Sequence, residues 1–423
     1  MLGEEVRVAR RPGFPAVLWA PCRGSRQRFA LAGVACGASD LAYTPAGGGV
    51  PREVPAGTAH FLEHQLFEGE SANAFAFFAD LGASANAYTD YHETAYHVAC
   101  IDGFSKAFGH LLAFLRDPRF TPETVQKERG IIAQEIRMYA DDPDSACVHG
   151  VHQALFARHP ARIDIAGSVE SIRRVTPATL YEAYWAFYHP SRIVVCAAGN
   201  VAWEEVLARV EEEFAKPVAR SPRPWRPGRR LAVREPAGVH RRLWRRRMDV
   251  ALPKALVAFK EAELGLAGRA LARQRMATSF LGDLLFGPSS RFYEENSASG
   301  LIDDDFGFGA QNHSDFGYTL AGGRTKDPAR LRARVLETVR RARQEGIGAG
   351  DFERVRTKAL GAFLKTFHSP AAVAQILASC HFAGVDLFDY GRLLSDLSPA
   401  DLARRLAGHF REDRSVMAVI EPK

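Results

Sequence analysis

The chain has 423 residues and a mass of 46.5 kDa, which is enough for about two to three domains with a substantial core. Hydrophobic residues make up 47% and charged residues 25%, so the composition excludes a disordered, collagen-like or coiled-coil chain. The net charge of +6 permits nucleic acid as a partner but does not indicate it.

The sequence shows no signal for membrane insertion or secretion. No window reaches the roughly 18 apolar residues of a membrane span, and the stretch from Met1 to Arg11 carries Glu4 and Glu5 and lacks a secretory pattern. The six cysteines are scattered without close pairs, as is typical of free thiols in a reducing compartment. We therefore expect a cytoplasmic protein with no membrane attachment, no disulfide framework and no cysteine zinc site.

Strands and helices are predicted to follow one another without strict alternation. The apolar patterns predict strands at 16–19, 29–36, 94–100 and 193–198, and helices at 58–67, 104–117, 122–139, 177–187 and 201–214. The early strands form a hairpin, so we expect an α+β fold with largely antiparallel sheets rather than a doubly wound fold.

Two halves of like fold are predicted on either side of a proline-rich linker. Residues 217–236 hold five prolines and no apolar pattern, which predicts an extended linker between domains at 1–216 and 237–423. The apolar positions of Phe61–Phe67 return 219 residues later, and those of Thr176–Leu180 return 222 residues later at Ser398–Leu402. Two matches at nearly one offset predict two homologous α/β-sandwich domains, each with helices packed on a largely antiparallel sheet.

An H-x-x-E-H pattern lies inside the helical stretch that begins near Thr58. On a helix His60 and His64 share one face, so both imidazoles can reach one metal ion. Glu63 lies beside them, where its carboxylate can take a proton from a zinc-activated water and later protonate the leaving amine. The alternative is an amphipathic helix whose histidines are merely solvated.

A third ligand is expected from a second helix. Glu128 and Glu135 are seven residues apart and hence lie on one helical face. A catalytic zinc site needs three protein ligands and an open position, and Glu135 is the best third ligand. Glu128 is expected to be a supporting carboxylate that steadies a histidine or the bound water.

Four segments in this order resemble the pitrilysin/insulinase family of inverted-zincin metallopeptidases. They are Gly57–Glu68, Gly82–Thr89, Glu128–Glu135 and Tyr188–Ser191. The resemblance covers most of the chain and is closest to the small bacterial two-domain members, which are related in outline to mitochondrial processing peptidase. It implies one Zn²⁺ per chain on His60, His64 and Glu135, with Glu63 as the general base of a zinc endopeptidase.

The same resemblance implies where a peptide substrate binds. Members of the family add the substrate as a strand against a sheet edge, and the matching segment here consists of Ser84, Ala85, Asn86, Ala87 and Tyr88. Its small residues suit close approach of two backbones, because main-chain hydrogen bonds then supply affinity with little regard to substrate sequence.

One departure from the family pattern predicts a partner. Active family assemblies place an arginine and a tyrosine, shortly after an S-S-R-like helix, over the zinc. Here Ser289-Ser290-Arg291 is followed by no such pair, and Arg291 and Tyr293 come too early. Ser279, Gly282 and Asp283 replace the metal residues of the first half, so the second half is expected to hold no zinc. We therefore expect a heterodimer in which a non-catalytic homologue supplies the missing pair, although a homodimer stays open.

Two rival functions remain at this point. The chain is a non-catalytic peptide-binding scaffold if its zinc is purely structural, but an intact Glu63 argues against that. The stretch Arg220–Arg247 holds eleven arginines and one acid, a composition also found in RNA-binding proteins. We interpret this stretch as a basic linker and an exposed strand face, and expect no nucleic-acid partner.

Overall fold

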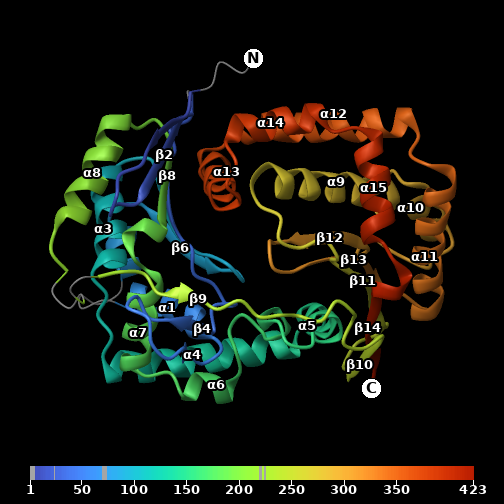
Figure 1. The fold of residues 1–423 in the computed structure, drawn as a ribbon, viewed down its shortest axis with the longest axis horizontal. Helices are drawn as coiled ribbons and strands as arrows, with labels where there is room; N and C mark the ends of the chain where they lie inside the picture. Colours follow the sequence, from blue (N-terminus) through green and yellow to red (C-terminus); the bar gives the residue numbers. More distant parts are fainter. Residues whose placement is uncertain (1–4, 23, 69–73, 219–221, 223–224) are drawn as a thin grey trace. The chain divides into compact units, whose positions relative to one another are not determined.

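The computed structural model describes residues 5–22, 24–68, 74–218, 222 and 225–423, and Figure 1 shows its helices and strands. The chain forms two compact units. The first comprises Met1–Ile136, Asp164–Leu231 and Leu364–Phe382, and the second comprises Arg137–Ile163, Ala232–Phe363 and Ala383–Lys423. Part of the predicted linker, at 219–221 and 223–224, lies outside the described residues, and the predicted boundary at 217–236 stays a prediction.

A six-stranded sheet forms the centre of the first unit. Its strands in spatial order are β1 (Arg7–Ala9), β2 (Ala16–Pro21), β8 (Ile193–Gly199), β3 (Arg28–Val34), β7 (Thr94–Cys100) and β6 (Ser84–Thr89). β2 and β8 run parallel, and every other neighbouring pair of these strands is antiparallel. A small sheet consists of β5 (Arg52–Glu53), β4 (Ala42–Thr44) and β9 (Arg229–Arg230). The middle strands β8 and β3 are buried, whereas β6 forms an edge.

Helices pack around the sheet of the first unit. They are α1 (Thr58–Phe67), α2 (Ala74–Asp80), α3 (Phe104–Arg116), α4 (Pro122–Asp141), α6 (Val169–Arg173), α7 (Pro177–Phe187), α8 (Trp203–Ala215) and α13 (Pro370–Ala383), with a 3-10 turn η2 (Pro190–Arg192). α3 and α8 lie side by side and pack on the sheet (Figure 1). α1 packs against β6, β7, α3 and α7, which places it beside the edge strand.

The second unit is built on a five-stranded sheet. Its strands in spatial order are β10 (Leu243–Met248), β14 (Ser415–Pro422), β11 (Lys254–Lys260), β13 (Gly317–Arg324) and β12 (Gly307–Asn312). Its helices are α5 (Pro143–Leu155), α9 (Gly268–Phe286), α10 (Arg291–Ala298), α11 (Pro328–Glu345), α12 (Ala349–Thr366), α14 (Leu387–Asp396) and α15 (Pro399–His409), with 3-10 turns η1 (Pro160–Arg162) and η3 (Glu412–Arg414). α5 packs against β10, β11 and β14, and α9 packs against β12 and α15.

The two sheets share one topology. The order β2-β8-β3-β7-β6 corresponds to β10-β14-β11-β13-β12, and in each sheet the first pair is parallel and the rest are antiparallel. The two repeats seen in the sequence fall on equivalent helices, α1 with α9 and α7 with α15. α7 and α15 both begin with a capping box, at Thr176 and at Ser398. The predicted α+β fold with two like halves is confirmed.

Among the described residues, no single helix is both long enough and apolar enough to span a membrane. α13 and α14 reach that length and apolar character only when the two helices are counted together. The part of α13 that contributes includes Val373, Ala374 and Leu377, whose side chains are buried in the structure.

Candidate metal centre

A close approach of two backbone segments fixes where α1, the helix that carries both histidines, begins. α1 begins at Thr58, directly after Gly57, whose φ of +88° lies in the left-handed region that favours glycine. A Cβ on Gly57 would lie 2.3 Å from the carbonyl oxygen of Ala166. The first turn of α1 is therefore held tightly against the segment that precedes α6.

The apolar side of α1 then sets the direction of its polar side chains. Phe61 and Leu62 are fully buried in the core of the first unit, which fixes the rotation of the helix about its axis. His60 and His64 stand one turn apart on the other side, with their ring centroids separated by 4.7 Å.

α4 supplies the carboxylates that face these rings. Val125 and Ile132 anchor α4 in the core, and Glu128 shares that face and is only 3% exposed. Glu135 lies two turns further along and is partly exposed.

A glutamine joins the two helices. Gln65 of α1 is buried and donates its Nε2 to the carbonyl oxygen of Thr124 at 3.1 Å, while the Thr124 hydroxyl donates to its Oε1 at 3.0 Å. This pair of bonds holds α1 and α4 in register beside the site. The sequence analysis did not single out Gln65, although a buried glutamine inside an apolar helical stretch is a usable signal for such a link.

The structure brings the three predicted ligands together. Nε2 of His60 lies 3.7 Å from Oε1 of Glu135, and Nε2 of His64 lies 3.4 Å from Oε2 of the same carboxylate. One donor atom from each residue lies within 4.8 Å of the others, and this is the cluster of metal-ligating side chains found in the described part of the chain. Nδ1 of His64 lies 3.0 Å from Oε2 of Glu128, which places Glu128 behind the histidine as predicted.

These donors fit a zinc ion. Ligand atoms about 2.0–2.1 Å from a tetrahedral zinc stand about 3.3–3.5 Å apart, close to the two distances between imidazole nitrogen and carboxylate oxygen. The hydrogen bond between Nδ1 and Glu128 turns Nε2 of His64 toward Glu135, where this nitrogen can bind a metal ion in exchange for its proton. Two imidazoles and one carboxylate, with a carboxylate behind one imidazole, form a donor set typical of catalytic zinc.

The electrostatics of the cluster favour a cation. Burial, assisted by the charge of His64, lowers the pKa of His60 to about 4. Burial also opposes protonation of His64, but its hydrogen bonds to Glu128 and Glu135 prevail and raise the pKa of His64 to about 9. Burial raises the pKa of Glu63 as well. Three carboxylates around two imidazoles therefore attract positive charge to the space between the rings and Glu135.

Glu63 stands beside the cluster without being one of its ligands. Its Oε2 accepts a hydrogen bond of 2.6 Å from the hydroxyl of Thr89, the last residue of β6. This bond orients the carboxylate and ties α1 to the edge strand. The sequence analysis gave Thr89 no role of its own, and the signal available was a hydroxyl residue at the end of the matching strand segment.

The predicted substrate-binding segment forms the edge strand β6. Ser84, Ala85, Asn86, Ala87 and Tyr88 all lie in it, with exposure that alternates along the strand. β6 pairs with β7 along one side and is the last strand of the sheet on the other.

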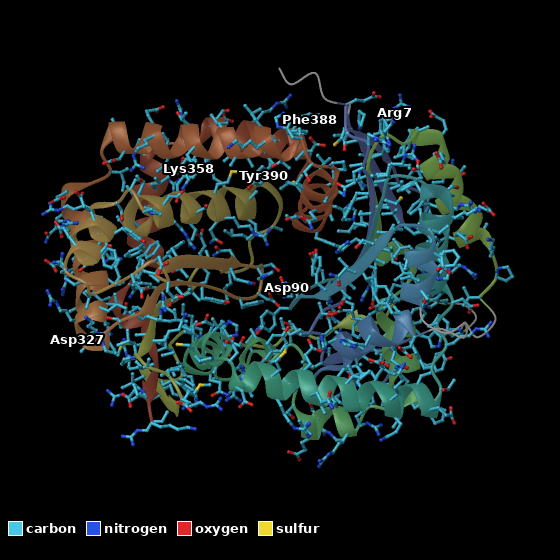
Figure 2. The ribbon with its side chains drawn as sticks, turned by 180° about the vertical axis from the view of Figure 1, so that it is seen from behind. Arg7, Asp90, Asp327, Lys358, Phe388 and Tyr390 are labelled. Atoms are coloured by element: carbon cyan, nitrogen blue, oxygen red, sulfur yellow. The ribbon has the colours of Figure 1, made fainter. Side chains whose placement is uncertain are left out.

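The hairpin turn determines which backbone groups face outward. Asp90, labelled in Figure 2, donates its N–H to the carbonyl oxygen of Glu93 at 2.7 Å, so these two residues form a hydrogen-bonded pair. Because such pairs alternate along an antiparallel ladder, the backbone groups of Ala85, Ala87 and Thr89 point away from β7. The N–H of Ala87 is bonded instead to the side-chain Oδ1 of Asn86 at 2.8 Å.

The equivalent helix of the second unit carries no metal ligands. Ser279, Gly282 and Asp283 occupy the matching positions of α9, as the sequence indicated. A Cβ on Gly282 would lie 2.2 Å from the ring of Phe308, and Asp283 forms an ion pair of 2.7 Å with Lys358, which is labelled in Figure 2.

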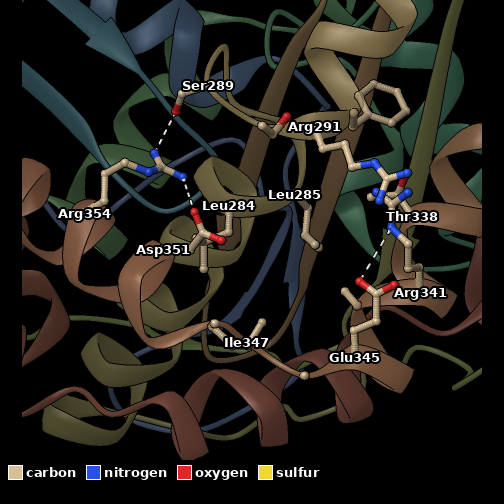
Figure 3. Close-up of a pocket in the computed structure, with 15 residues that line it drawn as sticks. Leu284, Leu285, Ser289, Arg291, Thr338, Arg341, Glu345, Ile347, Asp351 and Arg354 are labelled. Carbon is tan, nitrogen blue, oxygen red and sulfur yellow. Dashed lines mark hydrogen bonds and ion pairs between the residues drawn. The ribbon is translucent and has the colours of Figure 1, made fainter.

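Figure 3 shows the surroundings of the S-S-R segment in the second unit. Ser289 accepts a hydrogen bond of 2.7 Å from Arg354, which also donates to Asp351 at 3.1 Å. The Arg291 side chain is 66% exposed and pairs with Glu295 one turn along α10. Tyr293 packs near the ring of Phe306. Within the second unit, Arg291 and Tyr293 are thus used in local contacts.

Comparisons with known proteins match this arrangement. Residues 49–168 match the family described as insulinase (peptidase family M16), and residues 174–359 match the peptidase M16 inactive domain. The Bacillus subtilis protein named uncharacterized zinc protease YmfH is 35% identical over 95% of this chain and 93% of its own length. The probable β-subunit of mitochondrial processing peptidase from Arabidopsis thaliana is 30% identical over 38% of this chain and 31% of its own. A crystal structure of an M16-like peptidase from Alicyclobacillus acidocaldarius superposes with a TM-score of 0.94, at 35% identity, over 100% of this chain and 99% of that one.

Proposed function

Because the chain belongs to the insulinase family of peptidases, family M16, we propose that it is a zinc-dependent endopeptidase that cleaves peptides or short unfolded segments. The observation that carries this proposal is the convergence of His60, His64 and Glu135, with the carboxylate of Glu63 beside them but outside the ligand cluster. A purely structural zinc site would need no such carboxylate.

In this proposal His60, His64 and Glu135 hold one zinc ion. Bound there, zinc supplies Lewis acidity that polarises the scissile carbonyl and lowers the pKa of a water molecule to about 7. The carboxylate of Glu63 takes the proton from the attacking water as the new C–O bond forms. It then delivers that proton to the amine nitrogen as the C–N bond breaks, so the cycle ends with Glu63 ionised.

Neighbouring residues prepare Glu63 for this task. The Thr89 hydroxyl engages Oε2 and leaves Oε1 for the water. Burial raises the pKa of Glu63, which makes its carboxylate a stronger base than an exposed one.

We further propose that the substrate backbone adds to the outer edge of β6. A strand bound there can accept a hydrogen bond from the N–H of Ala87, which the Asn86 side chain now occupies. Thr89 couples this edge to Glu63, so a peptide aligned on β6 is brought to the carboxylate that activates the water.

The proposed active form is a heterodimer with a non-catalytic homologue, with a homodimer as the alternative. The second unit uses Arg291 and Tyr293 in local contacts, and the similar Arabidopsis protein is by name one subunit of a peptidase. In this arrangement the partner supplies the arginine and tyrosine that hold the substrate carbonyl, and this chain supplies zinc and the base.

The test is hydrolysis of a quenched fluorescent peptide mixture by the zinc-loaded chain, alone and together with a purified non-catalytic M16 homologue. Glu63→Gln should lower turnover by at least about a hundredfold while zinc content stays unchanged, because the amide cannot accept the proton. Glu205→Gln, an exposed change on α8, is the matched control and should behave as wild type.

The outcomes separate the parts of the proposal. Cleavage only in the presence of the homologue supports the heterodimer, and zinc-dependent cleavage by the chain alone contradicts it. If Glu63→Gln keeps near-normal turnover at full zinc occupancy, the assignment of Glu63 is wrong. If the chain binds peptides but cleaves none under any condition, the result would favour the alternative function, a non-catalytic peptide-binding scaffold.

A further inference from the structure

The strand β10 is the last strand of the sheet in the second unit, and no strand covers its outer side in the part of the chain that the structure describes (Figure 1). In the first unit, β1 pairs with β2, the counterpart of β10, along that same side. Val17 of β2 and Leu243 of β10 are equivalent positions. Their partners on the neighbouring parallel strands, Val195 and Met417, are 222 residues apart, which is the offset that also relates α7 to α15. The second unit therefore leaves open an edge that the first unit closes with a strand of its own.

A row of backbone groups on β10 faces this open side. Met417 of β14 donates its N–H to the carbonyl oxygen of Arg242 at 3.0 Å. Alternate residues of a strand direct their backbone groups to the same side, so the even-numbered residues of β10 face β14. The N–H and C=O groups of Leu243, Arg245 and Arg247 consequently face outward, and they have no backbone partner among the described residues.

The side chains at this edge carry positive charge that is only weakly balanced. Leu243, Arg245 and Arg247 point to one face of the sheet because side chains alternate along a strand, and all three are exposed. Nε of Arg245 lies 3.7 Å from Oε1 of Glu421, and Arg247 forms no ion pair with any residue that the structure describes. Residues 240–248 include five arginines and no acidic residue. The edge is therefore strongly basic.

The segment that enters β10 is bound elsewhere and does not close this edge. Glu235 accepts a hydrogen bond of 2.9 Å from the N–H of Ala157, and bonds of 2.7 Å from the N–H groups of Arg158 and His159. Lys260 donates to the same carboxylate at 2.7 Å, and the side chains of this ion pair are each only 4% exposed. These bonds hold the entering segment against the residues that follow α5, so the outer side of β10 stays accessible to another strand.

The charge and the backbone groups together select the occupant. Arginines on an edge strand repel a second copy of the same edge, which is one way in which proteins prevent aggregation. The same arginines attract an acidic strand, because opposite charges on directly opposed residues of two strands stabilise the pair. A nucleic acid would match the charge but has no donors in register with the three outward carbonyl groups, whereas an extended acidic peptide matches both.

We propose that the outer edge of β10 binds an extended acidic segment of a partner protein as an added antiparallel strand, as β1 is added to β2 in the first unit. In that register one acidic residue of the partner lies opposite Arg247, and a second one, two residues later, lies opposite Arg245. An apolar residue lies opposite Leu243 after a further two residues. The recognised pattern is thus acid-x-acid-x-apolar. No residue of the metal centre takes part, so this inference stands whether or not the chain hydrolyses peptides.

The experiment is a fluorescence anisotropy titration of a labelled, capped peptide with the sequence Gly-Glu-Thr-Glu-Thr-Val-Gly. The zinc-loaded Glu63→Gln variant is used, so that hydrolysis does not consume the peptide. Arg247→Glu in this background should weaken binding at least about fivefold, because an attraction between opposed residues becomes a repulsion. A peptide with lysine in place of both glutamates should bind the Arg247→Glu variant more tightly than it binds the parent chain. Arg330→Glu in the exposed first turn of α11 is the matched control and should leave the affinity unchanged.

Two methylated peptides test the backbone contacts at constant charge. N-methylation of the second glutamate, which lies opposite Arg245, removes an N–H that faces β10 and should abolish saturable binding. N-methylation of the first threonine removes an N–H that faces away from β10 and should be tolerated.

The proposal is overturned if the glutamate peptide does not bind saturably, if the lysine peptide binds the parent chain equally well, or if the two methylated peptides behave alike. Binding that Arg247→Glu leaves unchanged would place the peptide at another edge, such as β6, and would also overturn it. If a short single-stranded RNA binds in an Arg247-dependent way and the glutamate peptide does not, the edge is a nucleic-acid site and the proposal is wrong.

Discussion

Glu128 shows how much of the metal centre depends on a side chain placed behind the ligands. Its carboxylate is buried, yet it faces a histidine rather than the space between the donors. By accepting the Nδ1–H of His64 it fixes the tautomer, holds the ring and makes the opposite nitrogen a better donor.

Glu128→Gln tests this positioning role. The amide keeps the size and can still accept a hydrogen bond, but it removes the negative charge, so we expect zinc affinity to fall by about 10- to 100-fold. Competition with a fluorescent zinc chelator measures the change. Glu123→Gln, in the exposed first turn of the same helix, should leave the affinity unaltered. Equal affinities for both variants would contradict the role given to Glu128.

The sequence predicted which three candidate ligands the structure brings together, but not every residue that positions them. His60, His64 and Glu135 follow from spacing on two helices, because helical geometry is local. Thr89 and Gln65 reach the site through contacts between distant segments, and no spacing in the chain reports such a contact.

At the scale of elements, the edge strand β6 connects the central sheet to Glu63 through the hydroxyl of Thr89. In the proposed function its outward backbone groups bind a substrate strand, while the hydroxyl of its last residue, Thr89, donates to Glu63. The proposed function therefore depends on a main-chain N–H as well as on side chains.

Ala87→Pro removes the outward N–H without breaking a bond to β7. Proline is tolerated on an edge strand where its nitrogen faces solvent, so the fold and zinc content should survive. We expect kcat/KM to fall by at least about tenfold, since one main-chain hydrogen bond to the substrate is lost. Ala87→Ser keeps the N–H and is the control. Wild-type kcat/KM in the proline variant would exclude strand addition at this residue.

The start of α15 offers a prediction about pH. Asp401 is buried, which opposes its ionisation, but hydrogen bonds from Arg273 and Ser398 hold its pKa at about 2, below the ordinary value of 3.8. A lowered pKa means that the charge stabilises the folded state fully above about pH 4, and that this contribution is lost as the pH falls toward 2.

Asp401→Asn should therefore lower the thermal midpoint at pH 7 by several degrees, for a loss of about 2 kcal/mol. The difference between variant and wild type should shrink as the pH falls from 4 to 2. Asp351→Asn, which breaks an exposed pair with Arg354, should change the midpoint little at any pH. A pH-independent difference at Asp401 would show that charge is not the cause.

The long helices of the first unit were predicted well, and two of the predicted ranges, 58–67 and 177–187, agree with α1 and α7 at both ends. The short strands β4, β5 and β9 were missed, because two or three residues carry no periodicity. The grouping of 137–163 with the second unit and 364–382 with the first arises from packing between distant segments, which local patterns do not contain. The cytoplasmic location stays a prediction.

At the scale of the whole molecule, both units have the same sheet topology, but the described residues form a cluster of candidate metal ligands only in the first unit. The two sheets match strand for strand, yet the described residues of the second unit offer no group of metal ligands. In the part of the chain that the structure describes, the duplicated scaffold thus brings candidate metal ligands together in one place.

We accordingly expect one zinc ion per chain by elemental analysis or native mass spectrometry. His60→Ala should reduce zinc content to near zero, because two ligands do not hold a catalytic zinc. His368→Ala changes an exposed histidine of the first unit that is not part of the cluster, and it should leave the zinc content at one. Two zinc ions in the wild type, or one retained in His60→Ala, would contradict the single centre.

Gly282 has a consequence for any attempt to build a second metal motif into the second half. The ring of Phe308 lies 2.2 Å from where a Cβ would be, and it stacks between Phe286 and Phe410. Restoring a glutamate at 282 would collide with that ring unless Phe308 had been replaced first. A second metal motif would therefore need changes at both 282 and 308, and no single substitution at 282 can supply it.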